Sequence, residues 1–224
     1  MKQVNIAILG FGTVGSGVYQ VLTEGRASIQ HREQLNIDVR RILVRDLVTE
    51  RNIGAAPMEL FTTSYADIVN DPEISIVVEC MGGTVPAKDY ILRALAAGKT
   101  VVTSNKEVLA KHWPDFERQA KETGAGLYFE ATAGGGVPII RTLLDAMQAN
   151  NITRLMGIIN GTTNYILTKM TEEGRNYAEV LAEAQKLGYA EANPSADVEG
   201  WDSVYKLSIL ASIAFHARVN IDDI

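Results

Sequence analysis

The feature that most constrains the fold of this chain is a glycine-rich turn near the N-terminus, set between a strand pattern and a helix pattern. An apolar run at residues 4–9 leads directly into Gly10-Phe-Gly-Thr-Val-Gly15, after which apolar residues recur at helical spacing. In such a G-x-G-x-x-G turn, glycine permits the tight bend, lets a pyrophosphate approach the backbone, and lets helix and strand pack closely. An ordinary glycine turn is the alternative, but the flanking strand and helix favour a dinucleotide site. Its expected residues are Gly10, Phe11, Gly12, Thr13, Val14 and Gly15.

Strand-like and helix-like segments alternate through the part of the chain that follows this turn. Apolar runs typical of buried strands lie at residues 37–44, 74–78, 100–103 and 127–129. Strands that alternate with helices indicate a doubly wound parallel sheet, so we predict an α/β, Rossmann-type domain. One expected helix, at 107–123, contains Pro114, which predicts a break into two helices because proline lacks the backbone donor.

The alternation of strands and helices ends after residue 130, where a glycine-rich segment at 131–138 begins. We therefore predict a dinucleotide-binding domain at 1–130 and an α+β substrate and dimerisation domain at 131–224. In this second domain we expect a strand at 152–159 and helices at 139–149, 165–173, 177–187 and 200–216. With one clear strand, a sheet there would need partners that the chain does not obviously supply.

Composition excludes several classes of partner. The 224 residues carry 21 Lys and Arg against 27 Asp and Glu, and no basic run forms the patch that nucleic acid or an anionic membrane would require. A single cysteine, Cys80, excludes an intramolecular disulfide and suits a reducing cytosol. No apolar stretch approaches the ~20 residues of a membrane span, and the N-terminus lacks the features of a signal peptide. We therefore expect a soluble, cytoplasmic protein that binds neither nucleic acid nor a membrane.

The ends of two predicted strands carry residues suited to a cofactor. Arg45 and Asp46 follow the second strand, where an acid binds a ribose hydroxyl and an arginine suits a 2′-phosphate. We therefore favour NADP without excluding NAD, and a solvated charge pair is the alternative. Thr103, Ser104 and Lys106 follow the fourth strand, at the carboxyl edge where open α/β sheets bind ligands. A lysine placed there can reach cofactor or substrate.

A cluster of charged residues surrounds the start of the last predicted helix. Asp202 and Lys206 are four residues apart, acid first, so they share a helix face and can pair. The loop before them contains Glu191 and Asp197, which bring further carboxylates near a lysine suited to proton transfer. An exposed ion pair without a special function is the alternative.

Five segments, taken together, resemble homoserine dehydrogenase. They are the glycine turn at 10–15, Ser-Asn-Lys-Glu at 104–107, Glu-Ala-Thr-Ala-Gly-Gly-Gly-Val-Pro at 130–138, Gly-Ile-Ile-Asn-Gly-Thr-Thr-Asn-Tyr at 157–165, and Gly-Tyr-Ala-Glu-Ala-Asn-Pro at 188–194 followed by Asp202 and Lys206. The similarity runs nearly end to end, and the last two segments are the most specific. It implies NAD(P)-dependent interconversion of L-homoserine and L-aspartate 4-semialdehyde by hydride transfer, on the route to threonine and methionine.

The resemblance also implies residue roles. Lys206 would be the acid/base that moves the hydroxyl proton, Asp202 its nearby carboxylate, and Glu191 the group that binds the substrate amine. The expected substrate set is Glu191, Thr162, Asp197 and Lys106, and the expected cofactor set adds Arg45, Thr103, Ser104 and Lys106 to the glycine turn. The family also binds a monovalent cation, usually sodium, through backbone oxygens that fall here on Glu130, Ala133, Gly135 and Val137.

The resemblance is incomplete at the C-terminus. The family ordinarily continues beyond the last helix with further strands of the substrate domain, so we expect a truncated second domain here and a homodimer in the full-length form. Two alternatives stay open. The first alternative to a homoserine dehydrogenase is a dinucleotide-binding fragment without turnover. The second is a sugar or polyol dehydrogenase with a similar nucleotide domain, although it would not account for residues 191–206.

Overall fold

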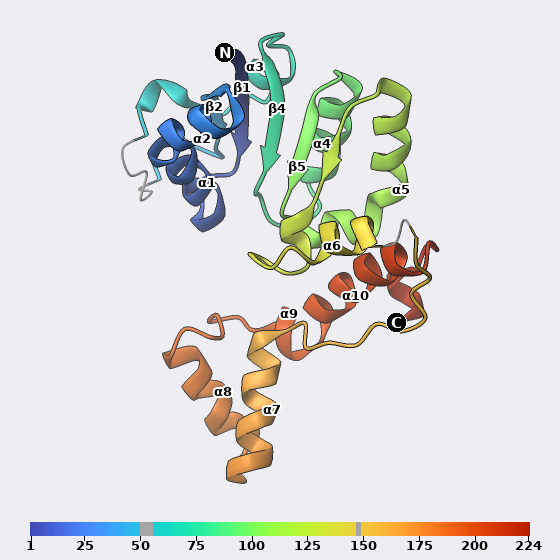
Figure 1. The fold of residues 1–224 in the computed structure, drawn as a ribbon. Coiled ribbons are helices and arrows are strands. Elements are labelled where there is room, and N and C mark those ends of the chain that lie inside the picture. Colours follow the sequence, from blue (N-terminus) through green and yellow to red (C-terminus); the bar gives the residue numbers. More distant parts are fainter. Residues whose placement is uncertain (50–55, 147–148) are drawn as a thin grey trace. The chain divides into compact units, whose positions relative to one another are not determined.

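The computed structural model of the chain describes residues 1–49, 56–146 and 149–224. These residues form two compact units, Met1–Thr132 and Ala133–Ile224, and each unit is described by itself (Figure 1). Within the described ranges, no helix combines the length and the apolar character needed to cross a membrane.

A parallel sheet forms the centre of the first unit. In the described residues it has six strands in the order β3-β2-β1-β4-β5-β6, and all neighbouring pairs are parallel. The strands are β1 (Lys2–Leu9), β2 (Leu35–Leu43), β3 (Phe61–Thr62), β4 (Ile74–Glu79), β5 (Thr100–Thr103) and β6 (Leu127–Tyr128). The chain runs outward from β1 to β3, then crosses to β4 and runs outward to β6. The predicted Rossmann-type sheet is confirmed, and its order reverses between β1 and β4, the place where such sheets bind ligands.

Helices follow most of these strands. They are α1 (Thr13–Glu24), α2 (Arg26–Glu33), α3 (Ala66–Val69), α4 (Ala87–Ala96) and α5 (Lys106–Thr123), with short 3-10 turns η1 (Met58–Leu60) and η2 (Glu130–Thr132). The apolar residues Ala87, Ile91 and Leu95 repeat every four positions in α4, so one stripe of this helix is fully buried. Helices α4 and α5 pack side by side, as Figure 1 shows.

Helix α5 corrects one prediction. It continues through Pro114 from Lys106 to Thr123, so the expected break into two helices is wrong. Proline removes one backbone hydrogen bond, but the apolar face of α5 is anchored on both sides of it, because Val108 and Phe116 are completely buried. Asn105 also caps the start of the helix by accepting a hydrogen bond from the Val108 amide at 3.1 Å.

The second unit is helical in its described residues. Its elements are α6 (Ile139–Ala146), α7 (Gly161–Glu173), α8 (Tyr177–Lys186), α9 (Ser195–Val198), α10 (Trp201–Ala214) and η3 (Ile221–Asp223). The predicted helix at 139–149 extends over 147–148, which lie outside the described residues. Helices α7 and α8 pack against each other through a small apolar cluster of Ile166, Val180, Ala184 and Ala190.

The predicted strand at 152–159 is wrong, because residues 149–160 form neither helix nor strand. A strand is stabilised by backbone hydrogen bonds to a neighbouring strand, and the described residues of this unit supply none. The apolar pattern that predicts the strand is real, but two of its side chains, Met156 and Ile158, are 80% and 76% exposed.

Candidate functional site

The glycine turn has the geometry that a dinucleotide requires. Gly10 follows β1 with φ +90°, and a Cβ on it would lie 3.0 Å from the carbonyl oxygen of Cys80. A Cβ on Gly15 would lie 2.0 Å from the carbonyl oxygen of Gly10, so the turn and α1 pack too closely for any side chain. A Cβ on Gly12, in contrast, would meet nothing within 4 Å. The middle glycine therefore leaves open space where a phosphate can approach the backbone.

The start of α1 is suited to an anion. Its N-cap residue is Gly12, which has no side chain to cap the helix, so the first backbone amides are available to a ligand. Thr13 and Val14 are exposed in this first turn. The Phe11 side chain is buried and makes edge-to-face contacts with Tyr19 and Phe61, so Phe11 can offer a ligand only its backbone.

The end of β2 presents a cation. Arg45 is exposed directly beyond this strand. The neighbouring Asp46 is turned into its own loop, where its Oδ1 accepts hydrogen bonds from the amides of Val48 at 3.1 Å and Thr49 at 2.6 Å. Because the acid is engaged locally while the arginine is exposed, this strand end is better suited to a 2′-phosphate than to a free ribose hydroxyl.

The ends of β4 and β5 are joined by a buried carboxylate that the sequence analysis missed. Glu79 is fully buried, its Oε1 accepts from the Met81 amide at 2.7 Å, and its Oε2 accepts from the Thr103 hydroxyl at 2.6 Å. Thr103 Oγ1 in turn accepts from the Asn105 amide at 3.0 Å. Burial raises the pKa of Glu79 above its usual value. The available signal was an acidic residue at the end of an otherwise apolar strand.

The predicted residues after β5 lie at this carboxyl edge. Ser104 and Lys106 are half-buried there, and Lys106 is the first residue of α5. The network from Glu79 through Thr103 fixes the backbone just before this lysine. Burial raises the pKa of the Cys80 thiol, directly after β4, to about 11, which keeps this thiol protonated near neutral pH and disfavours a nucleophilic role.

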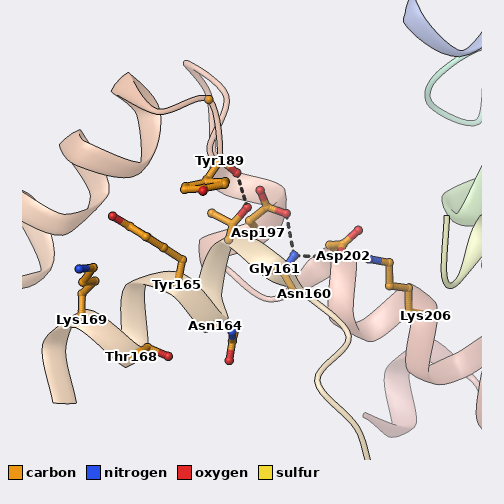
Figure 2. Close-up of a pocket in the computed structure, with 12 residues that line it drawn as sticks. Asn160, Gly161, Asn164, Tyr165, Thr168, Lys169, Tyr189, Asp197, Asp202 and Lys206 are labelled. Atoms are coloured by element: carbon orange, nitrogen blue, oxygen red, sulfur yellow. Dashed lines mark hydrogen bonds and ion pairs between the residues drawn. The ribbon is translucent and has the colours of Figure 1, made fainter. Parts of the chain in front are cut away.

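The second unit contains a polar pocket of about 640 Å³, formed by α7, α10 and the segment between α8 and α10 (Figure 2). It brings together four predicted residues, Thr162, Asp197, Asp202 and Lys206. The complete lining is Asn160, Gly161, Thr162, Asn164, Tyr165, Thr168, Lys169, Gly188, Tyr189, Asp197, Asp202 and Lys206.

Lys206 is held at the wall of this pocket by two acceptors. Its Nζ lies 2.8 Å from Asp202 Oδ2, one helical turn earlier on α10, and donates to the carbonyl oxygen of Ile159 at 2.8 Å. The Asp202 side chain is 8% exposed and that of Lys206 is 19% exposed. The alternative of a solvent-exposed ion pair on the helix surface, which the spacing in the sequence allowed, is therefore wrong. An ammonium has three N–H bonds, and the third can reach a ligand in the pocket.

One asparagine side chain and one threonine side chain form hydrogen bonds that hold the wall of the same pocket in place. Asn160 Nδ2 donates to Asp197 Oδ1 and to Asp202 Oδ2, each at 2.8 Å, as the dashed lines in Figure 2 show. The Thr162 hydroxyl donates to the carbonyl oxygen of Tyr189 at 2.7 Å. The sequence analysis did not select Asn160, although its position directly before a helix is typical of a capping residue whose amide also has donors to share.

Two groups of predicted residues are not gathered in this pocket. Glu191 is exposed and lies outside the lining, and its carbonyl oxygen accepts from Gln185 Nε2 at 3.1 Å. The residues expected to bind a cation are divided between the two units: Glu130 belongs to the first, and Ala133, Gly135 and Val137 belong to the second. Because each unit is described by itself, the cation site stays a prediction. Among the described ranges, no three His, Cys, Asp or Glu side chains form a metal-ligand cluster.

Comparison with known proteins decides the family. Residues 10–130 match the family model described as homoserine dehydrogenase, NAD binding domain, and residues 138–224 match the model described as homoserine dehydrogenase. The chain belongs to the homoserine dehydrogenase family. The two matches divide the chain as the structure does, with the glycine turn in the first and the polar pocket in the second.

Individual relatives support this family. The homoserine dehydrogenase of Bacillus subtilis (strain 168) is 42% identical over 224 residues, which cover 100% of this chain and 52% of that protein. The crystal structure of a homoserine dehydrogenase from Thiobacillus denitrificans is 43% identical with a TM-score of 0.92, over 99% of this chain and 51% of that one. A hyperthermophilic archaeal homoserine dehydrogenase in complex with NADPH is 31% identical with a TM-score of 0.83, over 96% of this chain and 71% of that one. The chain thus spans about half the length of the Bacillus and Thiobacillus relatives.

Proposed function

We propose that this chain catalyses the NADP-dependent interconversion of L-homoserine and L-aspartate 4-semialdehyde. The observation that carries the proposal is the position of Lys206, whose ammonium is fixed between Asp202 and the Ile159 carbonyl at the wall of the polar pocket. We name the substrate from membership of the homoserine dehydrogenase family, and the cofactor from the glycine turn in the NAD-binding domain.

The residues of the first unit fit a dinucleotide. Open space at Gly12 and the uncapped start of α1 suit the pyrophosphate, and exposed Arg45 suits the 2′-phosphate of NADP. The archaeal relative in complex with NADPH supports the same cofactor here. When bound, NADP⁺ supplies the two-electron acceptor that takes the hydride from the carbinol carbon. Lys106, at the first turn of α5, is proposed to contact the cofactor and the reacting end of the substrate.

Lys206 moves the proton in this proposal. When homoserine is oxidised, the neutral amine of Lys206 accepts the hydroxyl proton as the carbinol carbon loses its hydride, so that a carbonyl forms. In the reverse direction the ammonium returns the proton to the nascent alkoxide. Asp202 and the Ile159 carbonyl hold Nζ in one place, so that the third N–H bond is directed at the substrate oxygen.

Carboxylates and hydroxyls orient the substrate. Asp197 and Thr162 belong to the pocket lining and are proposed to contact it. Glu191 is proposed to bind the substrate ammonium, and this role rests on the resemblance to the family. Opposite charge at one end of a small amino acid decides which carbon is presented for hydride transfer.

The decisive experiment measures the initial rate of NADP reduction by L-homoserine at alkaline pH, followed by the absorbance of the reduced nicotinamide. A titration of cofactor affinity by fluorescence is run beside it. Turnover that depends on homoserine, and not on a sugar alcohol offered at the same concentration, supports the proposal. Cofactor binding without turnover indicates a dinucleotide-binding fragment, and turnover of the sugar alcohol indicates a polyol dehydrogenase.

We further propose three properties that rest on the resemblance to the family. They are a cytoplasmic location, a homodimer in the full-length form, and a monovalent cation such as sodium at Glu130, Ala133, Gly135 and Val137. Light scattering tests the dimer. Thermal unfolding in sodium chloride against choline chloride at equal ionic strength tests the cation, because an ion that binds only the folded state raises the unfolding temperature.

A further inference from the structure

The side-chain amide of Asn160 is bonded on every side. Its Nδ2 donates to Asp197 Oδ1 and Asp202 Oδ2, and its Oδ1 accepts from the amide and the hydroxyl of Thr163, all four at 2.8 Å. The residue is only 6% exposed. Because both N–H bonds and the carbonyl oxygen are used, the amide has one orientation that satisfies its neighbours.

This amide stands between two acids. Asn160 Nδ2 donates to both acids, so Asp197 Oδ1 and Asp202 Oδ2 can be separated by no more than the sum of the two donor–acceptor distances. Two carboxylates at that separation repel each other in a partly buried site. Lys206 contacts Asp202 directly, and Asn160 supplies a donor to each acid without adding a charge.

We propose that Asn160 is a positioning residue for the reaction, which holds Asp197 and Asp202 as neighbouring acceptors and thereby fixes the place of the Lys206 ammonium. The inference rests on the proposed function and deepens it. Asn160 acts through the two aspartates, one on α9 and one on α10, and so joins the start of α7 to both of these helices.

One substitution separates this role from helix capping. Asn160→Asp retains an oxygen that can cap α7, since Asp and Asn cap equally well, but it replaces both N–H donors with a third carboxylate oxygen. The chain offers a matched control in Asn176→Asp. Asn176 is exposed, caps α8 by accepting from the Glu179 amide at 3.0 Å, and lies outside the pocket lining.

Four results are expected. Asn160→Asp lowers kcat by about 100-fold or more, while the affinity for NADP stays unchanged. It lowers Tm by about 5–10 °C relative to Asn176→Asp, because buried acceptors lose their donors. The double variant Asn160→Asp with Asp197→Asn restores one of the two amide–carboxylate hydrogen bonds, the one between positions 160 and 197, and recovers about half of that Tm loss. Oxidation of homoserine by Asn160→Asp also needs a higher pH for half-maximal kcat, because the new carboxylate replaces a neutral amide beside Asp202, the partner of Lys206. The other charged residues in the pocket lining are Asp197 and Lys169.

The outcomes distinguish this inference from the proposed function. If wild-type chain oxidises homoserine and Asn160→Asp matches Asn176→Asp in kcat and Tm, the positioning role is overturned and the function stands. A double variant no more stable than Asn160→Asp overturns it as well. If the wild-type chain shows no turnover, the proposed function fails and the role of Asn160 in that reaction fails with it, whereas the Tm comparison with its rescue still decides whether Asn160 holds the two aspartates together.

Discussion

The two units hold their charged side chains in different ways. In the first unit, the sheet register pairs Glu79, the last residue of β4, with Thr103, the last residue of β5, and Lys106 begins α5 just beyond that pair. In the described part of the second unit there is no strand, and Asp202 and Lys206 are held by side-chain hydrogen bonds that converge on Asn160 and on the carbonyl before it. We infer that the first site depends on backbone geometry and is most sensitive to added atoms, whereas the second depends on single polar groups and is most sensitive to their loss.

Each unit contains one buried carboxylate that shows this difference. Glu79 accepts from neutral donors, the Met81 amide and the Thr103 hydroxyl, and burial raises its pKa. Asp202 is 6% exposed and is paired with the Lys206 ammonium. Glu79, whose partners are neutral, joins the ends of two strands, whereas Asp202, whose partner is a cation, holds the Lys206 ammonium in position.

The largest effect should follow from Lys206→Ala. We expect kcat to fall by about 10²–10⁴-fold, because the proton would lose its acceptor, while NADP affinity is retained in the first unit. Steady-state rates and a fluorescence titration measure the two quantities. Lys186→Ala, which removes an exposed lysine at the end of α8, is the matched control. Wild-type rates for Lys206→Ala would remove this lysine from the mechanism.

The next largest effect should come from one methyl group in the glycine turn. Gly15→Ala places a carbon 2.0 Å from the Gly10 carbonyl oxygen, so the turn must move, and we expect a loss of about 3 kcal/mol or more in stability with NADP affinity lowered about 100-fold. Gly12→Ala adds the same group where nothing lies within 4 Å. It should change stability by less than about 1 kcal/mol yet weaken NADP binding about 10-fold. Similar stability losses in both variants would contradict the backbone-based account.

Sequence predicted the first unit well because its rules are local and repetitive. Alternating strands and helices, with a glycine turn after the first strand, are sufficient to specify a parallel sheet and its ligand edge. The errors came where tertiary packing decides. Pro114 does not break α5, since buried Val108 and Phe116 anchor the helix on both sides, and residues 152–159 form no strand, since a strand needs a neighbour.

The sites were predictable in part. Spacing alone placed Asp202 and Lys206 on one helix face, and the structure shows that they pair. It could not select Asn160 or Glu79, because their importance lies in partners 42 and 24 residues away in the chain. Long-range hydrogen bonds of this kind leave no period in a sequence.

A smaller, pH-dependent effect should distinguish Glu79, the buried carboxyl group of the first unit. Because burial raises the pKa of Glu79 above its usual 4.5, its contribution to stability is complete below that pH and is lost as the pH rises through the raised pKa. Glu79→Gln removes this dependence and leaves a pH-independent cost of about 1 kcal/mol, because the Gln oxygen can still accept from the Met81 amide but the hydrogen bond to the Thr103 hydroxyl must reverse its direction. The Tm advantage of the wild type over Glu79→Gln should therefore shrink as the pH rises above 4.5. Glu59→Gln, at an exposed position of the same unit, controls for the loss of one charge. An advantage that grows with pH would contradict the assignment.

The smallest effect should appear at the end of β2. Arg45→Ala is expected to weaken NADP binding about 10-fold and NAD binding less than about twofold, because only NADP carries the 2′-phosphate that a guanidinium can bind. Arg32→Ala on α2 removes an equal charge from another exposed position and controls for general electrostatic attraction. Equal losses for the two cofactors would show that Arg45 acts only through net charge. A loss confined to NADP would show that even the unit built on backbone geometry uses one exposed side chain to choose its cofactor.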